Sequence, residues 1–432
     1  MTPTEPEVPL RGPALRLRGR CALALGSAAR WASRVTGRGA GAMIGGLVAM
    51  KLDPSVLRQL GAGRRTAVIT GTNGKSTTTR MVAAALSTLG PPPGPGRRHR
   101  TVATNSEGAN MDAGLIAALA ADRDAPLAAL EVDEMHVPHV ADAVHPAVIV
   151  LLNLSRDQLD RVGEINHIER TLRAGLARHP AAVIVANCDD VLITSAAYDC
   201  PHVVWVAAGG SWANDSVSCP RSGEVIVREQ SHWYSTGTDF KRPTPQWWVD
   251  GERIYGPDGF AAPMTLSLPG AVNRGNAAQG VAAAVAMGAD PLAAVAAVGT
   301  VDEVAGRYRT VRIGSHTARL LLAKNPAGWQ EALSMVDKSA AGVVISVNGQ
   351  VPDGEDLSWL WDVRFEHFEG TSVVAAGERG TDLAVRLGYA GVDHSLVHDT
   401  VAAIDSCPPG HVEVVANYTA FLQLQRALER TS

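Results

Sequence analysis

A glycine-rich segment lies between an apolar, strand-like run and a helix-like run, and it carries the residues that phosphate binding needs. After TAVI, residues 70–79 read TGTNGKSTTT. Glycines let backbone N–H groups close around phosphate oxygens, a helix N-terminus adds positive potential, and Lys75 can reach the outer phosphates. Two residues separate Gly71 from Gly74, which is a shortened form of the common phosphate loop. We predict a nucleotide phosphate site with Mg²⁺ on Ser76, against the alternative of an ordinary Gly/Asn/Thr turn.

Polar side chains follow several of the apolar runs. The string ALEVDEMH places Glu131, Asp133 and Glu134 at the end of one predicted strand. Parallel sheets present ligands at such ends, and a carboxylate there can bind Mg²⁺ directly or through water. The alternative is a set of surface acids. NLSRDQLDRVGEI and TNSEGANM bring further candidates, which are Asn153, Asp157, Gln158, Asp160, Asn105 and Glu107.

Strand-like apolar runs alternate with Ala- and Leu-rich helical runs. TAVIT, LAALEV, AVIVLLNL, AAVIVAN and HVVWVAA are strand-like, whereas MDAGLIAALAA and HIERTLRAGLARH are helical. This alternation predicts a parallel sheet covered by helices. Residues 209–265 are rich in Ser, Thr, Trp, Gly and Pro, and we expect a small β insertion there. A second α/β alternation after residue 311 predicts another domain.

Composition limits the classes of function. The 432 residues suit about two to three domains, and the net charge of −4 does not call for nucleic acid. Five scattered cysteines indicate a reducing cytoplasm. No run approaches the roughly 18 to 20 apolar residues that span a bilayer, and CALALGSAA is interpreted as a helix. The segment LRGPALRLRGR is interpreted as solvated surface, with anionic lipid headgroups as the alternative.

Six strings carry a family resemblance. GTNGKSTTT, TNSEGANM, LNLSRDQLDRVGEI, LAKNPAG, DGEDLSWLWDVRFE and ANYTA occur in this order between residues 71 and 420. Their joint order resembles the Mur ligase superfamily, whose members join an ATP-activated carboxylate to an amine, and within it the MurT branch. Other Mur ligases carry Asp-His where this chain has Asp157 and Gln158.

The resemblance implies an α/β fold with a Mur-ligase-like central P-loop ATPase domain and a C-terminal α/β Rossmann-like domain. The central domain would be a parallel sheet flanked by helices, with a small β insertion. The implied boundaries are an N-terminal arm with helices at 1–50, the ATP-binding domain at 51–310 with its insertion at 209–265, and a partner-docking ligase domain at 311–432.

The resemblance also implies roles for individual residues. Lys75 would contact the outer phosphates, while Ser76 and Glu131 would bind Mg²⁺. By sequence alone, Asn276 could equally cap a helix and Arg307 could be a surface arginine. The implied ATP-binding set is Gly71, Thr72, Asn73, Gly74, Lys75, Ser76, Thr77, Asn276 and Arg307. The residues implied at the edge of the site are Asn105 and Glu107.

The insertion departs from the family pattern. MurT proteins commonly carry a four-cysteine zinc ribbon, CPxCG followed by CxCG, but this chain reads CPRSGE and then STGTDFKR. Of the four positions only Cys219 is a cysteine, and one thiolate cannot close a structural zinc site. The other three positions are Ser222, Thr236 and Thr238. We expect no zinc, and a degenerate ribbon held by apolar packing of Trp233, Trp247 and Trp248.

The implied reaction is amidation of the α-carboxylate of D-glutamate in the lipid II stem peptide, through an acyl phosphate, to D-isoglutamine. No cysteine lies in a strand-to-helix elbow that suits a nucleophile, so ammonia must come from a second subunit. The resemblance implies a GatD-like glutaminase. Only 70 residues precede Gly71, too few for a nucleotide-sugar domain, so we expect a cytoplasmic protein that meets lipid-linked substrate at the inner membrane face.

Two other functions stay open at this point. One is a different amide ligase of the superfamily, such as a folylpolyglutamate-synthase-like enzyme, which adds an amino acid. The other is a non-catalytic, nucleotide-binding regulator of wall synthesis.

Asp356, in DGEDLSWLWD, is a candidate of a different kind. By sequence alone it could be a surface aspartate in a turn, and Asp353 and Asp362 compete for any special role. The resemblance implies that Asp356 serves the cysteine and histidine of the partner. A carboxylate that accepts the histidine N–H fixes its tautomer and stabilises the imidazolium.

Overall fold

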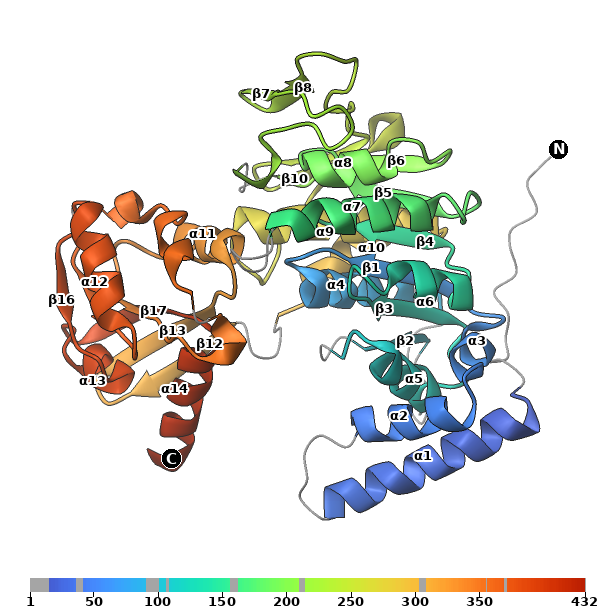
Figure 1. Ribbon diagram of the computed structural model, residues 1–432, viewed down its shortest axis with the longest axis horizontal. Helices are drawn as coiled ribbons and strands as arrows, with labels where there is room; N and C mark the ends of the chain where they lie inside the picture. Colours follow the sequence, from blue (N-terminus) through green and yellow to red (C-terminus); the bar gives the residue numbers. More distant parts are fainter. Residues whose placement is uncertain are drawn as a thin grey trace. The chain divides into compact units, whose positions relative to one another are not determined.

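The computed structural model describes residues 15–35, 42–90, 101–105, 109–155, 162–209, 214–302, 308–354, 356–368 and 371–431 (Figure 1). Contacts within the chain divide it into two compact units. The first unit comprises residues 1–154, 166–210 and 216–302. The second comprises residues 155–165, 211–215 and 303–432.

The first unit is built on a large, mainly parallel sheet. Its strands are β1 (Arg65–Thr70), β2 (Val102–Thr104), β3 (Leu127–Glu131), β4 (Val148–Leu151), β5 (Val183–Asn187), β6 (Val203–Ala207), β9 (Trp247–Asp250), β10 (Arg253–Tyr255) and β11 (Ala261–Pro263). Their order is β11-β10-β9-β6-β5-β4-β1-β3-β2, with β10 antiparallel to both of its neighbours and every other pair parallel. Strands β3 and β4 are buried along their whole length, as expected where helices cover both faces of a parallel sheet.

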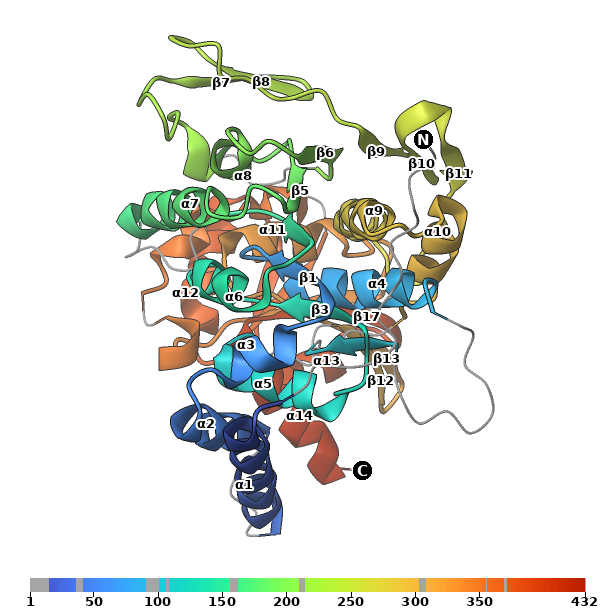
Figure 2. The ribbon, with the colours of Figure 1, turned by 90° about the vertical axis from the view of Figure 1, so that its right-hand side faces the viewer.

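Helices cover both faces of this sheet. The described helices of the first unit are α1 (Leu17–Val35), α2 (Ala42–Leu52), α3 (Val56–Gly61), α4 (Lys75–Ser87), α5 (Asp112–Ala121), α6 (Val137–Val144), α7 (Val162–Leu176), α8 (Val191–Ala197), α9 (Ala271–Ala286) and α10 (Pro291–Gly299). Figure 2 shows α4, α9 and α10 on one face and α6, α7 and α8 on the other. The predicted parallel sheet with flanking helices is therefore confirmed.

The strands of the expected β insertion belong to two different sheets. Strands β7 (Ile226–Glu229) and β8 (His232–Ser235) form a hairpin of their own, whereas β9 to β11 extend the main sheet. Trp233 is buried with Cys219, and its indole N–H donates to the Cys188 carbonyl at 3.0 Å. The other two tryptophans lie in β9, where Trp247 packs on Phe260 and Trp248 on Tyr255. The expectation that all three hold the ribbon is therefore wrong for the β9 pair.

The second unit is a smaller α/β layer structure. Its strands are β12 (Tyr308–Ile313), β13 (His316–Leu322), β14 (Gly342–Ser346), β15 (Val373–Ala376), β16 (His394–Leu396) and β17 (Gly410–Ala416), in the order β12-β13-β17-β14-β15-β16. Strand β12 is antiparallel to β13, and the other pairs are parallel. Its described helices are α11 (Pro326–Ser334), α12 (Gly380–Tyr389), α13 (Thr400–Asp405) and α14 (Tyr418–Thr431).

Two apolar clusters line the two faces of the second sheet. On one face, Trp329 of α11 stacks on Trp359 at 5.4 Å and packs against Phe365. On the other face, α13 and α14 cover a cluster that contains Ile404 and Phe421. The predicted second α/β domain is thus present, with the alternate residues of its strands buried on opposite sides.

Candidate nucleotide site

The glycine loop connects β1 to α4 and has no room for side chains at its two glycines. Gly71 has φ +143° and Gly74 has φ +83°, a region that favours glycine. A Cβ atom on Gly71 would lie 2.7 Å from the Cβ atom of Leu152, and one on Gly74 would lie 2.9 Å from the Asn276 Oδ1 atom. The loop is therefore enclosed by the residues after β4 and by helix α9.

Asn153 fixes the backbone of the loop from the neighbouring strand. Its carbonyl accepts the Thr72 N–H at 2.9 Å, and its side-chain Oδ1 accepts the Asn73 N–H at 2.9 Å. Its Nδ2 group donates to the Asn73 carbonyl at 3.1 Å. The sequence marked Asn153 as a polar residue at a strand end but assigned it no role. The structure shows that it shapes the loop.

The Lys75 ammonium lies over the loop. Its Nζ atom donates to the carbonyls of Gly71 at 2.6 Å and Thr72 at 3.3 Å. It also forms a mostly buried ion pair with Glu134 at 3.1 Å. Glu134 follows β3, among the acids noted at that strand end, although sequence reasoning gave it no specific role. A cation held at the N-terminus of α4 places positive charge where a phosphate would bind.

Glu131 has the environment expected of a magnesium ligand. It ends β3, and the parallel register pairs it with Ile69 of β1, just before the glycine loop. The carboxylate is buried, and among the described residues its Oε2 atom has no hydrogen-bond partner. Mg²⁺ is commonly held by one or two carboxylates together with substrate phosphates, so this orphaned oxygen and the Ser76 hydroxyl at the start of α4 suit the ion.

Asn105 acts on the backbone of Glu131. Its Nδ2 group donates to the carbonyls of Glu131 at 2.8 Å and Ala109 at 2.9 Å, and its Oδ1 atom accepts the Glu131 N–H at 2.8 Å. Buried Asn105 therefore positions the carboxylate-bearing residue. Glu107, expected beside it, lies outside the described residues.

Asn276 lies on α9 against the loop, with its side chain buried beside Gly74. Helix α9 starts at Ala271 after Gly270, so the alternative that Asn276 caps a helix is wrong. Its Nδ2 group donates to the Asn273 Oδ1 atom at 3.5 Å, which orients the amide. Thr77, the last residue of the expected ATP-binding set on α4, is buried. Four other candidates lie outside the described residues, namely Arg307, Asp157, Gln158 and Asp160.

One of the four positions that hold zinc ligands in the family is occupied here by Cys219, a buried free cysteine. Burial raises the pKa of Cys219, but hydrogen bonds from Ser222 and from the Arg221 backbone outweigh that effect and lower the pKa from its usual range. Among the residues that the structure describes, no group of three or more His, Cys, Asp or Glu side chains is arranged to hold a metal ion. The absence of zinc stays a prediction.

The aspartates of the second unit have different surroundings. Asp353 is buried and accepts hydrogen bonds from the backbone N–H of Thr419, at 3.0 Å, and from its hydroxyl, so it caps α14. Asp356 is exposed, and its Oδ1 atom accepts the Ser358 N–H at 2.8 Å. This backbone hydrogen bond, with one from the Ser358 side chain, lowers the pKa of Asp356.

Arg386 of α12 fixes the segment that follows Asp356. Its guanidinium donates to the carbonyls of Leu360 at 3.1 Å and Val363 at 2.8 Å. It also pairs with the Glu366 carboxylate at 2.9 Å and lies 5.4 Å from the centre of the Trp361 ring. The loop that presents Asp356 is therefore attached to a helix of the second sheet.

Comparisons with known proteins agree with this geometry. The Mur ligase middle domain family matches residues 69–284, and the MurT ligase C-terminal family matches residues 322–421. The chain is 26% identical to the lipid II isoglutaminyl synthase (glutamine-hydrolyzing) subunit MurT of Streptococcus pneumoniae, over 90% of this chain and 93% of that protein. Identity to the MurT subunit of Staphylococcus aureus is also 26%, over 95% of this chain and 98% of that protein.

Solved structures share the fold. A pseudomurein peptide ligase type C from Methanothermus fervidus matches with a TM-score of 0.64 at 16% identity, over 85% of this chain and 79% of that one. MurF from Acinetobacter baumannii matches with a TM-score of 0.61 at 17% identity, over 89% of this chain and 80% of that one. The chain belongs to the Mur ligase family, and its C-terminal part is of the MurT type.

Proposed function

We propose that this protein is the ligase subunit of a glutamine-hydrolysing lipid II isoglutaminyl synthase. The observation that carries the proposal is end-to-end similarity, over 90 to 95% of the chain, to proteins named as that subunit. The phosphate loop, the orphaned oxygen of Glu131 and the MurT-type C-terminal domain add support from separate parts of the sequence. The substrate is the α-carboxylate of D-glutamate in the lipid II stem peptide.

The reaction has two steps, both of which depend on neutralising negative charge. An oxygen of the substrate carboxylate attacks the γ-phosphorus of ATP, ADP leaves, and an acyl phosphate forms. The nitrogen of ammonia then attacks the acyl carbon, inorganic phosphate leaves with the C–O bond electrons, and the nitrogen loses a proton. Phosphorylation is needed because a free carboxylate repels nucleophiles and has no good leaving group.

The residues of the nucleotide site would act by position and charge. Lys75 and the backbone N–H groups of residues 74–76 would hold the β- and γ-phosphates, so that charge developing on the transferred group is met by fixed donors. The Thr72 and Asn73 N–H groups donate to Asn153 instead. Asn276 would contact the nucleotide beside Gly74, and we assign Arg307 to it as well. Ser76 and Glu131 would hold Mg²⁺, which would supply further charge neutralisation at the phosphates. Asn105 and Glu107 would border the substrate.

We assign the ammonia supply to a GatD-like glutaminase subunit. In that complex Asp356 would accept the N–H of the partner's catalytic histidine and stabilise the imidazolium that forms when the cysteine loses its proton. The exposure of Asp356 and the fixed loop behind it support this role. The complex would work at the inner face of the plasma membrane, where its lipid-linked substrate lies.

The proposal is tested by incubating the purified chain with lipid II, ATP, Mg²⁺ and ammonium chloride. We expect ADP release that depends on lipid II, and a product whose mass corresponds to one carboxyl changed to an amide. A folylpolyglutamate-synthase-like ligase would instead consume an amino acid. A non-catalytic regulator would bind ATP without substrate-dependent turnover. Either of these results contradicts the proposed function.

A further inference from the structure

Helix α1 packs on the protein with one side only. Its buried positions include Gly19, Ala22 and Gly26. A Cβ atom on Gly26 would lie 2.4 Å from the carbonyl oxygen of Gly45 on α2, so the two helices are in close backbone contact along this side. Both ribbon views place α1 at the outside of the first unit, with α2 between it and α5 (Figures 1 and 2).

The opposite side of α1 is apolar although it faces solvent. The side chains of Leu17, Leu25 and Trp31 are 76%, 55% and 68% exposed. At about 100° of rotation per residue, Leu25 and Trp31 lie roughly 80° and 40° to either side of Leu17, so the three residues share one half of the helix. Between them on the same face lie three small exposed side chains, Cys21, Ala24 and Ala28. This face is therefore the reverse of the polar outer face that a surface helix normally has.

Helix α2 adds to this exposed apolar surface. Four of its large side chains are exposed, namely Met43, Ile44, Leu47 and Leu52. Together with α1, residues 17–52 contribute seven of the nineteen large apolar side chains that are exposed in the described part of the chain. Scattered exposed apolar residues are ordinary, but seven of them on two neighbouring helices indicate an interaction site.

Within residues 15–52 the charges all have one sign, and Asp53, which follows α2, is buried. Residues 15–52 contain six arginines and one lysine and no aspartate or glutamate, whereas the whole chain has a net charge of −4. Arg16, Arg18 and Arg20 are exposed on α1 beside its apolar face, and Lys51 is exposed near the end of α2. The surface therefore combines apolar side chains with a basic border and is complementary to an anionic, apolar partner.

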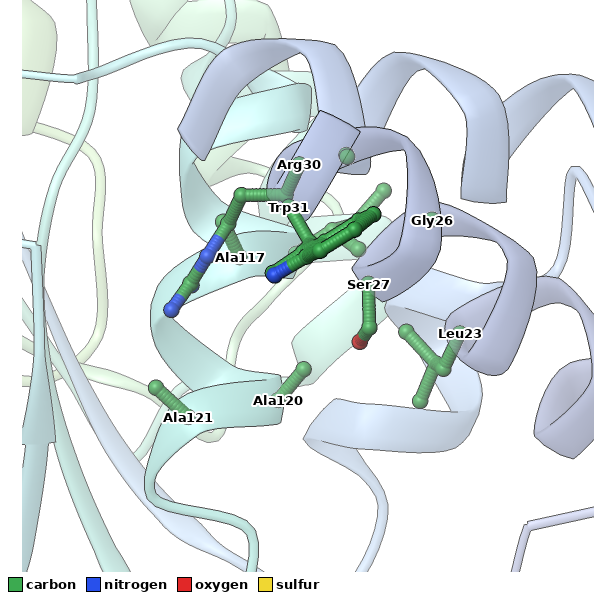
Figure 3. Close-up of a pocket in the computed structure, with 11 residues that line it drawn as sticks. Leu23, Gly26, Ser27, Arg30, Trp31, Ala117, Ala120 and Ala121 are labelled. Carbon is green, nitrogen blue, oxygen red and sulfur yellow. The ribbon is translucent and has the colours of Figure 1, made fainter. Parts of the chain in front are cut away.

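A hollow lies beside Trp31. Figure 3 shows Trp31, Arg30, Ser27 and Leu23 of α1 facing the small side chains of α5 across it. Its volume is about 440 Å³ and it is lined mainly by glycine, alanine and other apolar residues. The exposed indole ring of Trp31 therefore borders an apolar hollow as well as solvent.

We propose that the exposed faces of α1 and α2 dock on an anionic lipid bilayer. Interfacial helices bind membranes in this way, with apolar side chains among the acyl chains and Arg or Lys at the headgroups. None of the helices in the described part of the chain is long and apolar enough to cross a membrane, and both helices here would lie along its surface. The inference rests on the proposed function only in explaining why docking is useful, since a lipid-linked substrate lies at such a surface.

The test is co-sedimentation of the full chain with vesicles of phosphatidylglycerol and phosphatidylcholine in equal parts, and with vesicles of phosphatidylcholine alone. We expect binding to the anionic vesicles that weakens with added salt. The double variant Arg16→Glu and Arg20→Glu should bind about tenfold more weakly or worse, as should Leu25→Ala with Trp31→Ala. The matched controls are Lys241→Glu with Arg253→Glu, which makes the same change in net charge at exposed sites, and Leu292→Ala at another exposed apolar site.

Two results would overturn the inference. One is a wild-type chain that does not bind the anionic vesicles, or α1 variants that bind as well as the controls. The other is a wild-type dimer that dissociates in the Leu25 and Trp31 variant without vesicle binding, which would assign the surface to a second copy of the chain. Amidation of lipid II in detergent micelles distinguishes this failure from failure of the proposed function, because it requires the nucleotide site but no bilayer.

Discussion

At the scale of single residues, Lys75 is the side chain on which the nucleotide site depends most. Its three contacts, to two loop carbonyls and Glu134, hold the ammonium over the loop. Lys75→Ala removes this charge without opening the apolar core. We expect kcat/KM for lipid II amidation to fall roughly 100-fold or more while the circular dichroism spectrum is retained. Lys241→Ala, which removes an exposed lysine elsewhere in the unit, should amidate at the wild-type rate.

Asp356→Asn separates the two activities of the proposed complex. An amide can no longer stabilise the imidazolium of a partner histidine, so glutamine-driven amidation should fall strongly while ammonium-driven amidation is unchanged. The measurement compares both donors in the purified complex. Asp353→Asn is the matched control, because Asp353 caps α14 and its loss should lower the melting temperature without distinguishing the donors. If wild type and Asp356→Asn use glutamine equally well, Asp356 has no role in glutamine hydrolysis and is only part of a turn.

The sequence predicted the residues of the loop but not the residues that shape it. Gly71, Gly74 and Lys75 follow from their spacing between a strand and a helix. The role of Asn153 depends on β4 lying next to β1 in the sheet, which no local pattern reveals. Asn105 was expected at the edge of the site, yet its contacts are to the backbone of Glu131, because β2 pairs with β3.

At the scale of elements, Gly74 in the β1–α4 connection is required both by its positive φ angle and by the lack of room for a Cβ atom. Comparison with Gly63, which precedes β1, separates these two effects. Gly63 and Gly74 have similar positive φ angles, +74° and +83°, but a Cβ atom on Gly63 would meet nothing within 4 Å. Gly63→Ala should therefore cost about 1 kcal/mol of unfolding free energy through backbone strain alone and leave amidation unchanged. Gly74→Ala should cost more, because it also displaces the Asn276 amide, and it should raise the KM for ATP.

Denaturant unfolding and ATP kinetics of the two glycine variants check this prediction. If Gly63→Ala and Gly74→Ala lose equal stability and have equal KM values for ATP, the Asn276 side chain moves without cost and does not enclose the loop.

The attachment of the Asp356 loop to α12 gives a second prediction. Arg386→Ala would leave the carbonyls of Leu360 and Val363 without their donor and the Glu366 carboxylate without its cation, so we expect a loss of about 2 to 4 kcal/mol in the second unit. Arg379→Ala, at the residue directly before α12, breaks only an exposed pair with Asp382 and should cost less than about 1 kcal/mol.

Thermal unfolding of the two arginine variants measures the difference, and glutamine-driven amidation provides a second measure. We expect Arg386→Ala to lower the glutamine-driven rate more than the ammonium-driven rate, because the loop that presents Asp356 loses its anchor. If Arg386→Ala is as stable as Arg379→Ala, the aromatic packing of Trp359 and Phe365 is enough to hold the loop.

The strands that the sequence identified were the buried, continuous apolar runs. TAVIT, LAALEV, AVIVLLNL and AAVIVAN form almost wholly buried interior strands, because burial on both faces requires uninterrupted apolar residues. HVVWVAA forms the next interior strand, β6, which is mostly half-buried. The short edge strands β2 and β16 carry no such signal. The prediction of a separate β insertion was wrong in one respect, because β9 to β11 extend the main sheet. Alternating runs do not tell whether a strand forms a hairpin of its own or extends an existing sheet.

At the scale of the whole molecule, the proposed function divides the chemistry between two chains. The first unit carries the nucleotide site and the surface proposed to dock on membranes, and the second carries Asp356. None of the five cysteines of this chain was assigned a nucleophilic role, and Cys188 is buried with its pKa raised to about 12 by burial. Under the proposed function, we expect glutamine to serve as donor only when a glutaminase chain is present.

The most direct test of this account uses the chain alone and the chain co-purified with a glutaminase subunit encoded beside it. Both are given lipid II, ATP, Mg²⁺ and glutamine labelled with heavy nitrogen in its side-chain amide, and the mass of lipid II is followed. We predict that the complex places the heavy nitrogen on the stem peptide, whereas the chain alone does so only when labelled ammonium replaces glutamine. Amidation from glutamine by the chain alone, or no amidation by the complex with either donor, would contradict the account.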